Sequence, residues 1–198
     1  MKLKKEIILA SSSPRRQEIL DLAGIAHRVC PAETEWAPVD LPPAQRVLAL
    51  AHSKAQAVAS QQPDALILGA DTMVVLDDTA LGKPPTPEAA VEMLLLLQGR
   101  THRVMTGVSV IRTNADAKIV KQDGFTDVAE VRFFPMTREE AVSYVQTGEP
   151  LDKAGAYAIQ GLGMRFVRGI QGDFYTVMGL PGGRLIRYLQ KFAPDLWE

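Results

Sequence analysis

The sequence predicts a mixed α/β fold, in which helices cover a β-sheet. Short apolar runs of strand length alternate with helical patterns along the chain. Some strand patterns follow one another directly, which argues against a strictly parallel sheet. No long linker divides the 198 residues, so we expect residues 1–198 to form one domain with two α/β lobes around a cleft.

The first elements follow from apolar runs and helix boundary signals. Residues 6–10 (EIILA) are almost wholly apolar, which is typical of a strand covered on both faces. A helix follows, because Pro14 stands at a first helical position after a serine that can cap, and Gly24 is a natural stop. The next expected elements are a short strand at 27–31, a loop at 32–43 and a long amphipathic helix at 44–62.

Residues 65–77 (ALILGADTMVVLD) carry the strongest strand pattern in the chain, and GADT interrupts it. Farther along, Thr137 and Glu140 stand at capping-box spacing before a helix that Gly148 closes. The other elements expected after residue 77 are a helix at 86–99, strands at 102–113 and 125–136, short strands at 156–161 and 165–172, and a helix from about Gly182.

Composition excludes several classes of function. The formal net charge is −1, so no overall basic field would hold a long nucleic acid by counterion release, although a local cluster of cations could still bind a small anion. The single cysteine, Cys30, excludes an internal disulfide and a multi-cysteine metal site. No apolar segment is long enough for a secretory leader or a membrane span, so we expect a cytoplasmic protein without a membrane partner.

The segment SSSPRR, residues 11–16, suggests an anion site. A strand that runs into small hydroxyl residues and a helix start exposes backbone N–H groups at the positive end of the helix dipole. Ser11 adds a hydroxyl, and Arg15 and Arg16 add forked donors that suit phosphate. The alternative is a helix cap followed by surface arginines, which is the commoner use of such residues.

Asp71 of GADT is the second candidate. A carboxylate inside an apolar run costs free energy unless it is paired, hydrogen-bonded or bound to a metal. Interpreted as the end of a strand, the position suits a general base or a ligand of a hard metal ion. A turn-forming aspartate is the alternative, although Asp77 and Asp78 are better candidates for a turn.

Three more residues merit attention because of their side-chain chemistry. Gln160 lies in a glycine-rich stretch, EPLDKAGAYAIQGLG, and an amide can pair with the edge of a nucleobase. Lys54 lies on the predicted helix 44–62, and Lys83 follows GADT by about twelve positions. The alternatives are a surface amide for Gln160 and a solvated charge for Lys54.

Taken together, the motifs resemble the Maf family of nucleoside triphosphate pyrophosphatases. The matching segments cover most of the chain in family order, and their agreement is a stronger signal than any one of them. They are LASSSPRRQEIL, HSKAQA, LGADTMVVLDDTALGKP, THRVMTGVSV, TDVAEVRF, EPLDKAGAYAIQGLG and VMGLPGGRL.

The resemblance implies a long mixed sheet with two α/β lobes around a cleft, similar to the inosine-triphosphate pyrophosphatases. It implies hydrolysis of a nucleoside triphosphate between the α and β phosphates, with a divalent cation, Mg²⁺ or Mn²⁺. By motif, Asp71 would be the general base and a metal ligand. The implied phosphate contacts are Ser11, Arg15, Arg16, Lys54 and Lys83. The family's acidic loop, here CPAETEWAP, would supply Glu35 as a second metal ligand, with Glu33 as the alternative.

Three positions also resemble the branch of the family that hydrolyses dTTP and UTP, and they are Arg15, Thr72 and Gln160. The resemblance therefore implies dTTP and UTP as substrates, with Thr72 and Gln160 among the substrate-binding residues, and a homodimer. One alternative is a pyrophosphatase for 7-methyl-GTP or another modified nucleotide. Another is a non-catalytic nucleotide-binding regulator of cell division, which would have little use for a carboxylate facing a polyanion.

Overall fold

The computed structural model describes residues 3–33 and 36–198. In this part of the chain, seven strands form one mixed sheet in the order β2-β1-β3-β5-β6-β7, with β4 paired to β3. The strands are β1 (Ile7–Leu9), β2 (His27–Val29), β3 (Leu66–Leu76), β4 (Thr79–Leu81), β5 (Thr101–Thr113), β6 (Ile119–Phe133) and β7 (Val167–Gln171). Strand β1 pairs in parallel with β2 and β3, whereas β3–β4 and β6–β7 are antiparallel. The predicted mixed sheet is therefore confirmed.

Helices follow the strands as the alternation of patterns predicts. The α-helices are α1 (Pro14–Leu22), α2 (Pro43–Ala59), α3 (Pro87–Leu97), α4 (Arg138–Val145), α5 (Phe174–Met178) and α6 (Gly182–Phe192). Single 3-10 turns lie at η1 (Ala154–Ala156), η2 (Leu162–Phe166) and η3 (Pro194–Leu196). No helix within the described ranges is long and apolar enough to cross a membrane.

The chain divides into two compact units. Unit 1 comprises Met1–Asp71, Thr106–Asp127 and Gly179–Glu198, and unit 2 comprises Thr72–Met105 and Val128–Met178. Strands β3, β5 and β6 each contribute residues to both units.

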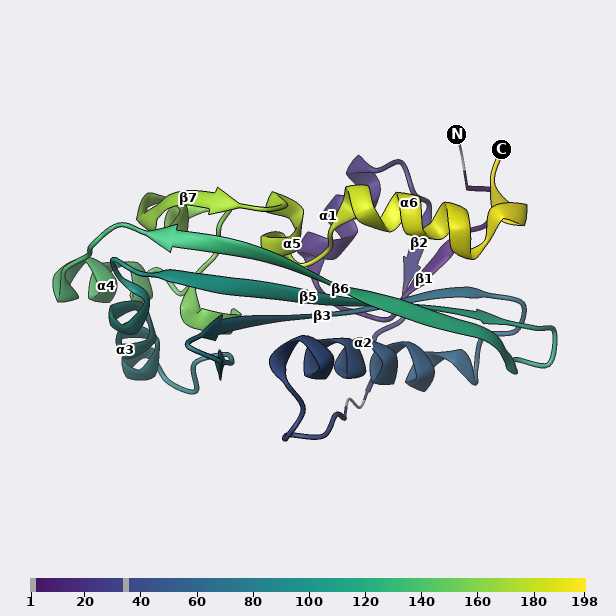
Figure 1. The fold of residues 1–198 in the computed structure, drawn as a ribbon, viewed down its shortest axis with the longest axis horizontal. Helices are drawn as coiled ribbons and strands as arrows, with labels where there is room; N and C mark the ends of the chain where they lie inside the picture. Colours follow the sequence, from purple (N-terminus) through teal and green to yellow (C-terminus); the bar gives the residue numbers. More distant parts are fainter. Residues whose placement is uncertain (1–2, 34–35) are drawn as a thin grey trace. The chain divides into compact units, whose positions relative to one another are not determined.

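In unit 1, helices cover both faces of the sheet. Figure 1 shows α2 on one face and α1 and α6 on the other. The core between α2 and the strands is made of buried small and branched side chains, namely Ile8, Ala10, Ala55, Val58, Ala59, Ala65, Ile67 and Ile111. The two ends of the chain meet, since Leu3 forms an antiparallel bridge with Trp197.

Helix α2 lies unusually close to the sheet because glycines face it. A Cβ on Gly69 of β3 would stand 2.2 Å from the carbonyl oxygen of Ala51, and one on Gly107 of β5 would stand 2.4 Å from that of Val47. No side chain fits at such distances. The sequence therefore places glycine where the helix backbone contacts the strands.

Unit 2 is built around an aromatic cluster. Helices α3 and α4 pack together. The rings of His102 and Tyr157 meet edge to face, and both contact Phe133. Tyr144 packs in turn on Phe166. Tyr157 and Phe166 belong to the segment between α4 and β7, which carries the predicted motif EPLDKAGAYAIQGLG.

Most boundary predictions are confirmed. Gly24, with φ +65°, follows the end of α1, and Thr137 and Glu140 form the expected capping box of α4. Asp77 and Asp78 form the predicted turn, between β3 and β4, and both have positive φ. Asp and Asn tolerate this left-handed conformation better than other residues with side chains.

Four local predictions were wrong. Ser13 stands at the N-cap of α1 but makes no side-chain cap bond, and its backbone N–H donates to Ser11 Oγ at 3.3 Å. Residues 156–161 form no strand, since the buried aromatic core holds them in irregular backbone around η1. Strand β6 begins at Ile119, six residues before its expected start, and GADT does not interrupt β3.

Candidate active site

Asp71 lies in the middle of β3 rather than at its end, so the strand-end interpretation was wrong. The strand runs unbroken over 11 residues, and only Asp71 and Thr72 in it escape full burial. Backbone ladder bonds hold the strand whatever the side chain is, which is why a carboxylate can interrupt the apolar pattern without breaking the strand. The Asp71 side chain is 16% exposed, so it can reach solvent, whereas the residues of β3 other than Asp71 and Thr72 are buried.

Lys54 is the partner of this carboxylate. Its Nζ donates to Asp71 Oδ1 at 2.6 Å, and its side chain is 17% exposed. Close packing of α2 on Gly69 brings the helix near enough for this contact. Partly buried charges of opposite sign gain more from pairing than exposed ones do. The two residues, both in unit 1, therefore form a largely enclosed ion pair.

Arg16 holds the SSSPRR segment in place through side-chain hydrogen bonds. Its guanidinium donates through Nη1 to Ser11 Oγ at 2.7 Å and through Nε to the carbonyl of Gly179 at 2.9 Å. Arg16 is only 8% exposed, whereas Arg15 is half-buried. Arg15 is thus the more accessible cation of the pair, and Arg16 ties the loop to the VMGLPGG segment.

The SSSPRR segment starts close to Asp71. Strands β1 and β3 run in parallel with Leu9 opposite Leu68, and Ala10 N–H donates to the Leu68 carbonyl at 2.8 Å. Ser11 follows this pair by two residues and Asp71 follows it by three. Because parallel neighbours run in step, the predicted anion loop and the predicted base emerge near the same point of unit 1.

Three predicted site residues belong to unit 2. Thr72 is half-buried and directly follows Asp71 in β3. Lys83 is exposed, and the carbonyl of the preceding Gly82 accepts from Gly155 N–H at 3.0 Å, which places the LGKP segment beside η1. Gln160 is half-buried between η1 and η2.

Sequence reasoning missed Glu149 and Tyr144. The Glu149 carboxylate accepts from the Tyr144 hydroxyl at 2.8 Å and from the backbone of the segment that carries Gln160. Partial burial acts to raise the pKa of Glu149, but these hydrogen bonds outweigh it, so the net pKa is lowered. The sequence signal that could have pointed to Glu149 is its place as a carboxylate at the start of the glycine-rich segment EPLDKAGAYAIQGLG.

The predicted metal ligands can be tested only in part. Glu35 lies outside the described residues, whereas Glu33 is exposed. Among the residues that the structure describes, no group of three or more His, Cys, Asp or Glu side chains could hold a metal ion. A single carboxylate such as Asp71 still suits Mg²⁺, which binds one or two carboxylates together with substrate phosphates.

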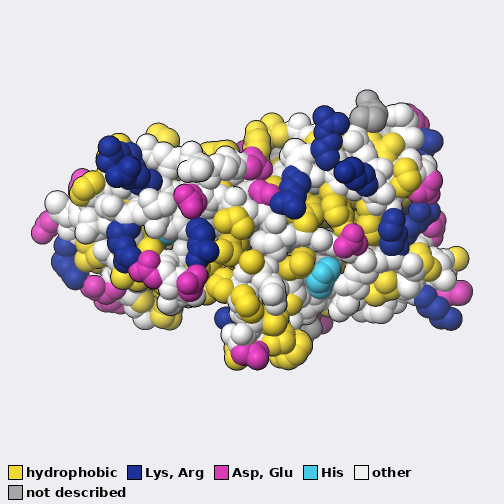
Figure 2. All heavy atoms as spheres, in the orientation of Figure 1, with side chains coloured by type: hydrophobic (Ala, Val, Ile, Leu, Met, Phe, Trp, Pro, Cys, Tyr) yellow, Lys and Arg dark blue, Asp and Glu magenta, His cyan; other side chains and the backbone are white. Residues whose placement is uncertain are grey.

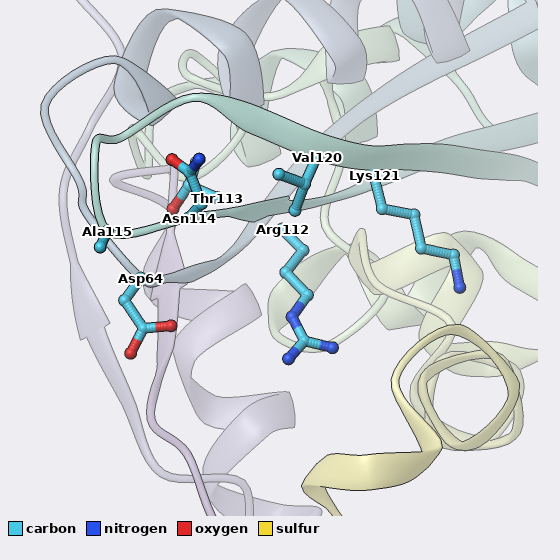
Figure 3. A pocket seen from close by; sticks show the side chains of 7 residues that line it. All are labelled: Asp64, Arg112, Thr113, Asn114, Ala115, Val120 and Lys121. Carbon is cyan, nitrogen blue, oxygen red and sulfur yellow. The ribbon is translucent and has the colours of Figure 1, made fainter.

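A separate shallow pocket contains none of the predicted residues. It lies in unit 1 near the β5–β6 turn (Figure 3) and is lined by Asp64, Arg112, Thr113, Asn114, Ala115, Val120 and Lys121. Its two cations are engaged, Arg112 with Asp195 at 2.8 Å and Lys121 with the carbonyl of Phe192 at 2.5 Å. On the face drawn in Figure 2, basic and acidic side chains are interspersed, and no large basic patch is visible there.

Comparison with solved structures identifies the class of fold. The chain is similar to the Ham1 protein of Staphylococcus aureus, with a TM-score of 0.50 and 14% identity over 94% of this chain and 98% of that one. At this identity the likeness concerns the fold alone.

The profile of the family described as Maf-like protein matches residues 6–192.

Related sequences agree with that match. A protein of Bacillus cereus strain G9842, named dTTP/UTP pyrophosphatase, is 47% identical over 97% of this chain and 98% of its own length. A protein of Bacillus anthracis with the same name is 46% identical over the same shares. This chain belongs to the Maf-like protein family.

Proposed function

We propose that this protein hydrolyses dTTP and UTP to the nucleoside monophosphate and pyrophosphate. The full-length relatives named dTTP/UTP pyrophosphatase support the substrates. One observation supports the chemistry most directly. Asp71 is a carboxylate that reaches solvent from a mostly buried strand, and its Oδ1 pairs with Lys54 Nζ at 2.6 Å. Rigid strand and helix backbones hold both groups, as a catalytic group requires.

The proposed reaction begins with a water molecule beside Asp71. The carboxylate accepts a proton from this water as its oxygen attacks the α phosphorus. The bond between the α phosphorus and the oxygen that bridges to the β phosphate breaks, and that oxygen leaves as part of pyrophosphate. Lys54 orients the carboxylate through its hydrogen bond and adds positive charge beside the phosphates.

Cationic groups must offset a substrate with about four negative charges near neutral pH. Arg15 is half-buried at the start of α1, and a guanidinium there can donate two parallel bonds to one phosphate. Ser11 and Arg16 hydrogen-bond to each other, so in this proposal they also shape the loop that binds phosphate. Lys83 is assigned a further phosphate contact by resemblance alone.

A divalent cation, Mg²⁺ or Mn²⁺, is part of the proposal. Asp71 and the substrate's phosphate oxygens would hold it, with Glu35 as the second carboxylate. When bound, such an ion neutralises phosphate charge and orients the leaving pyrophosphate.

Gln160 is proposed to recognise the base. An amide can both donate and accept, which suits the O2, N3–H and O4 edge shared by uracil and thymine. Cytosine presents an amino group and no N3–H on that edge, so a wrong base leaves polar groups unpaired. Thr72 is assigned to the same substrate by resemblance.

A panel of triphosphates tests the proposal. Pyrophosphate release is measured from dTTP, UTP, CTP, GTP and 7-methyl-GTP, each with Mg²⁺, Mn²⁺ or a chelator. We expect the highest kcat/KM for dTTP and UTP. Preference for 7-methyl-GTP would place the protein with the modified-nucleotide alternative, and tight binding without release would make it a nucleotide-binding regulator.

The cytoplasmic location, the homodimer and the single domain spanning residues 1–198 stay predictions. Sedimentation of the purified chain measures the oligomeric state directly.

A further inference from the structure

The segment that carries Gln160 is irregular in backbone yet firmly held. It spans Ala158–Gly163, between η1 and the first residues of η2, and belongs wholly to unit 2. Irregular backbone has no ladder bonds of its own, so other groups must satisfy its N–H donors. Two side chains from the region of α4, Tyr144 and Glu149, accept three of them, the N–H groups of Ala158, Leu162 and Gly163.

Glu149 receives three hydrogen bonds. Its Oε1 accepts from the Tyr144 hydroxyl at 2.8 Å and from Gly163 N–H at 3.0 Å, and its Oε2 accepts from Leu162 N–H at 3.0 Å. A carboxylate that accepts several N–H and O–H groups forms stronger bonds than a neutral acceptor does. Glu149 thereby anchors the chain two and three residues beyond Gln160.

Tyr144 anchors the other side. Its hydroxyl accepts from Ala158 N–H at 3.1 Å, two residues before Gln160, while it donates to Glu149. The ring is 1% exposed, so its position is fixed by packing. One continuous chain of hydrogen bonds therefore brackets Gln160 from both directions. We call Tyr144 and Glu149 the clamp.

Two glycines leave room for the clamp. A Cβ on Gly161 would stand 2.6 Å from Glu149 Oε2, and one on Gly163 would stand 2.6 Å from the Tyr144 hydroxyl oxygen. Gly161 also has φ +127°, a conformation that residues with side chains rarely adopt. Both glycines are thus required where the side chains of the clamp meet the backbone.

We propose that Tyr144 and Glu149 are positioning residues that set how Gln160 meets the nucleobase, and so govern the choice among pyrimidines. This inference rests on the proposed function. A hydrogen-bonding amide discriminates between bases only if its donor and acceptor are held in place, because a mobile amide can turn over and pair with either edge. The clamp holds the backbone on both sides of Gln160, and so limits where its amide can lie.

Turnover by Tyr144→Phe and Glu149→Gln tests the inference. Each variant removes part of the clamp while it keeps the size of the side chain. We expect the ratio of kcat/KM for UTP to that for CTP to fall about tenfold, as expected for a weakened hydrogen bond. The exposed Tyr175 and Glu130 allow matched controls, since Tyr175→Phe and Glu130→Gln should leave the ratio unchanged.

A double variant shows whether the clamp acts through Gln160. We expect Gln160→Ala alone to lower the ratio, and Glu149→Gln to lower it no further in that background. A merely structural role of Glu149 would reduce turnover of UTP and CTP in parallel. That parallel loss, or an additive effect of the two changes, would overturn the inference.

Hydrogen exchange tests the clamp without any substrate. In Glu149→Gln the amides of Leu162 and Gly163 should exchange faster, and in Tyr144→Phe that of Ala158 should do so, whereas unchanged exchange would overturn the clamp. If the unaltered protein releases no pyrophosphate from any triphosphate, the proposed function fails and the base-selection role falls with it. Faster exchange in the variants would still identify the clamp, so the two failures can be told apart.

Discussion

Single residues of this protein carry charge where the surrounding chain is apolar. Asp71 stands in a strand whose other members, apart from Thr72, are buried, and Lys54 is the ammonium that it meets. A carboxylate in such a place is stable only with a partner. Lys54 pairs with Asp71 in the free protein, and both groups would be available to act on a phosphate substrate.

The Asp71→Asn variant tests the general base. We expect kcat to fall about 10²–10⁴-fold, because an amide cannot accept the proton of the attacking water. The fold should persist, since the amide is almost the same size as the carboxylate. Asp77→Asn in the exposed β3–β4 turn is the matched control and should retain activity. Turnover of dTTP at a near-normal rate by Asp71→Asn would remove this residue from the mechanism.

His102 makes the stability of the fold depend on pH. The side chain is 2% exposed, and its Nε2 shares a hydrogen bond of 2.8 Å with the Tyr157 hydroxyl. Burial lowers the pKa of His102 to about 4, from 6.5 in an unfolded chain. As the solution is acidified, the unfolded state therefore binds a proton before the folded state does. The contribution of neutral His102 to the free energy of unfolding is complete above pH 6.5 and is lost as the pH falls toward 4.

We expect this loss to be on the order of 3 kcal/mol in the free energy of unfolding between pH 7 and 4. The His102→Gln variant cannot titrate there, so its stability should fall less over the same range, although it starts lower. Urea unfolding of both proteins at several pH values measures the difference. Equal losses in the two proteins would assign the acid sensitivity to other groups.

At the scale of elements, the approach of α2 to the sheet places the ion pair. Gly69 and Gly107 remove the side chains that would hold the helix away from β3 and β5. Lys54 reaches Asp71 because the two backbones are close. The distance between a helix and a strand thus determines a contact between two charged side chains.

The Gly69→Ala variant tests this packing. Its new methyl group would overlap the carbonyl oxygen of Ala51, so α2 must shift outward. We expect a loss of about 2 kcal/mol or more in the free energy of unfolding, together with lower activity as Lys54 moves from Asp71. Gly169→Ala in β7 is the matched control, because nothing lies within 4 Å of its Cβ, and we expect a change of about 0.5 kcal/mol or less. Similar stability of the two variants would contradict the packing argument.

At the scale of the whole molecule, the chain combines the Maf-like family's motifs with a mixed sheet and two compact units. Unit 1 holds the phosphate-binding candidates of α1 and α2 together with Asp71. Unit 2 holds Lys83 and the clamped segment of Gln160. Gln160, the residue proposed to recognise the base, thus belongs to unit 2, whereas Asp71 and the proposed phosphate contacts other than Lys83 belong to unit 1.

Removal of divalent cations tests whether the metal ion binds with the triphosphate or is already bound in the ligand-free protein. We expect a chelator to abolish pyrophosphate release but to leave the Tm of the ligand-free protein unchanged. The proposal gives the ion two carboxylates, Asp71 and Glu35, and completes its shell with phosphate oxygens, so the ion should bind together with the triphosphate. A fall of several degrees in Tm on chelation would instead indicate a structural ion.

Much of the fold could be predicted from local patterns. Strand and helix types, the Gly24 stop, the capping box at Thr137 and the Asp77–Asp78 turn depend on neighbours in the chain. The same reasoning placed a false strand at 156–161. There, buried tertiary contacts override the apolar pattern, since apolar residues are needed in any buried segment, whatever its backbone.

From the sequence alone follow the types of most elements, the resemblance to the family and the candidate site residues. The packing of distant elements is what brings Lys54 to Asp71 and joins Arg16 to Ser11 and Gly179. It also brings Tyr144 and Glu149 to the backbone on both sides of Gln160. Local patterns reflect the conformation of adjacent residues. Contacts between distant residues depend instead on how closely whole elements pack, and here small residues and buried rings set that distance.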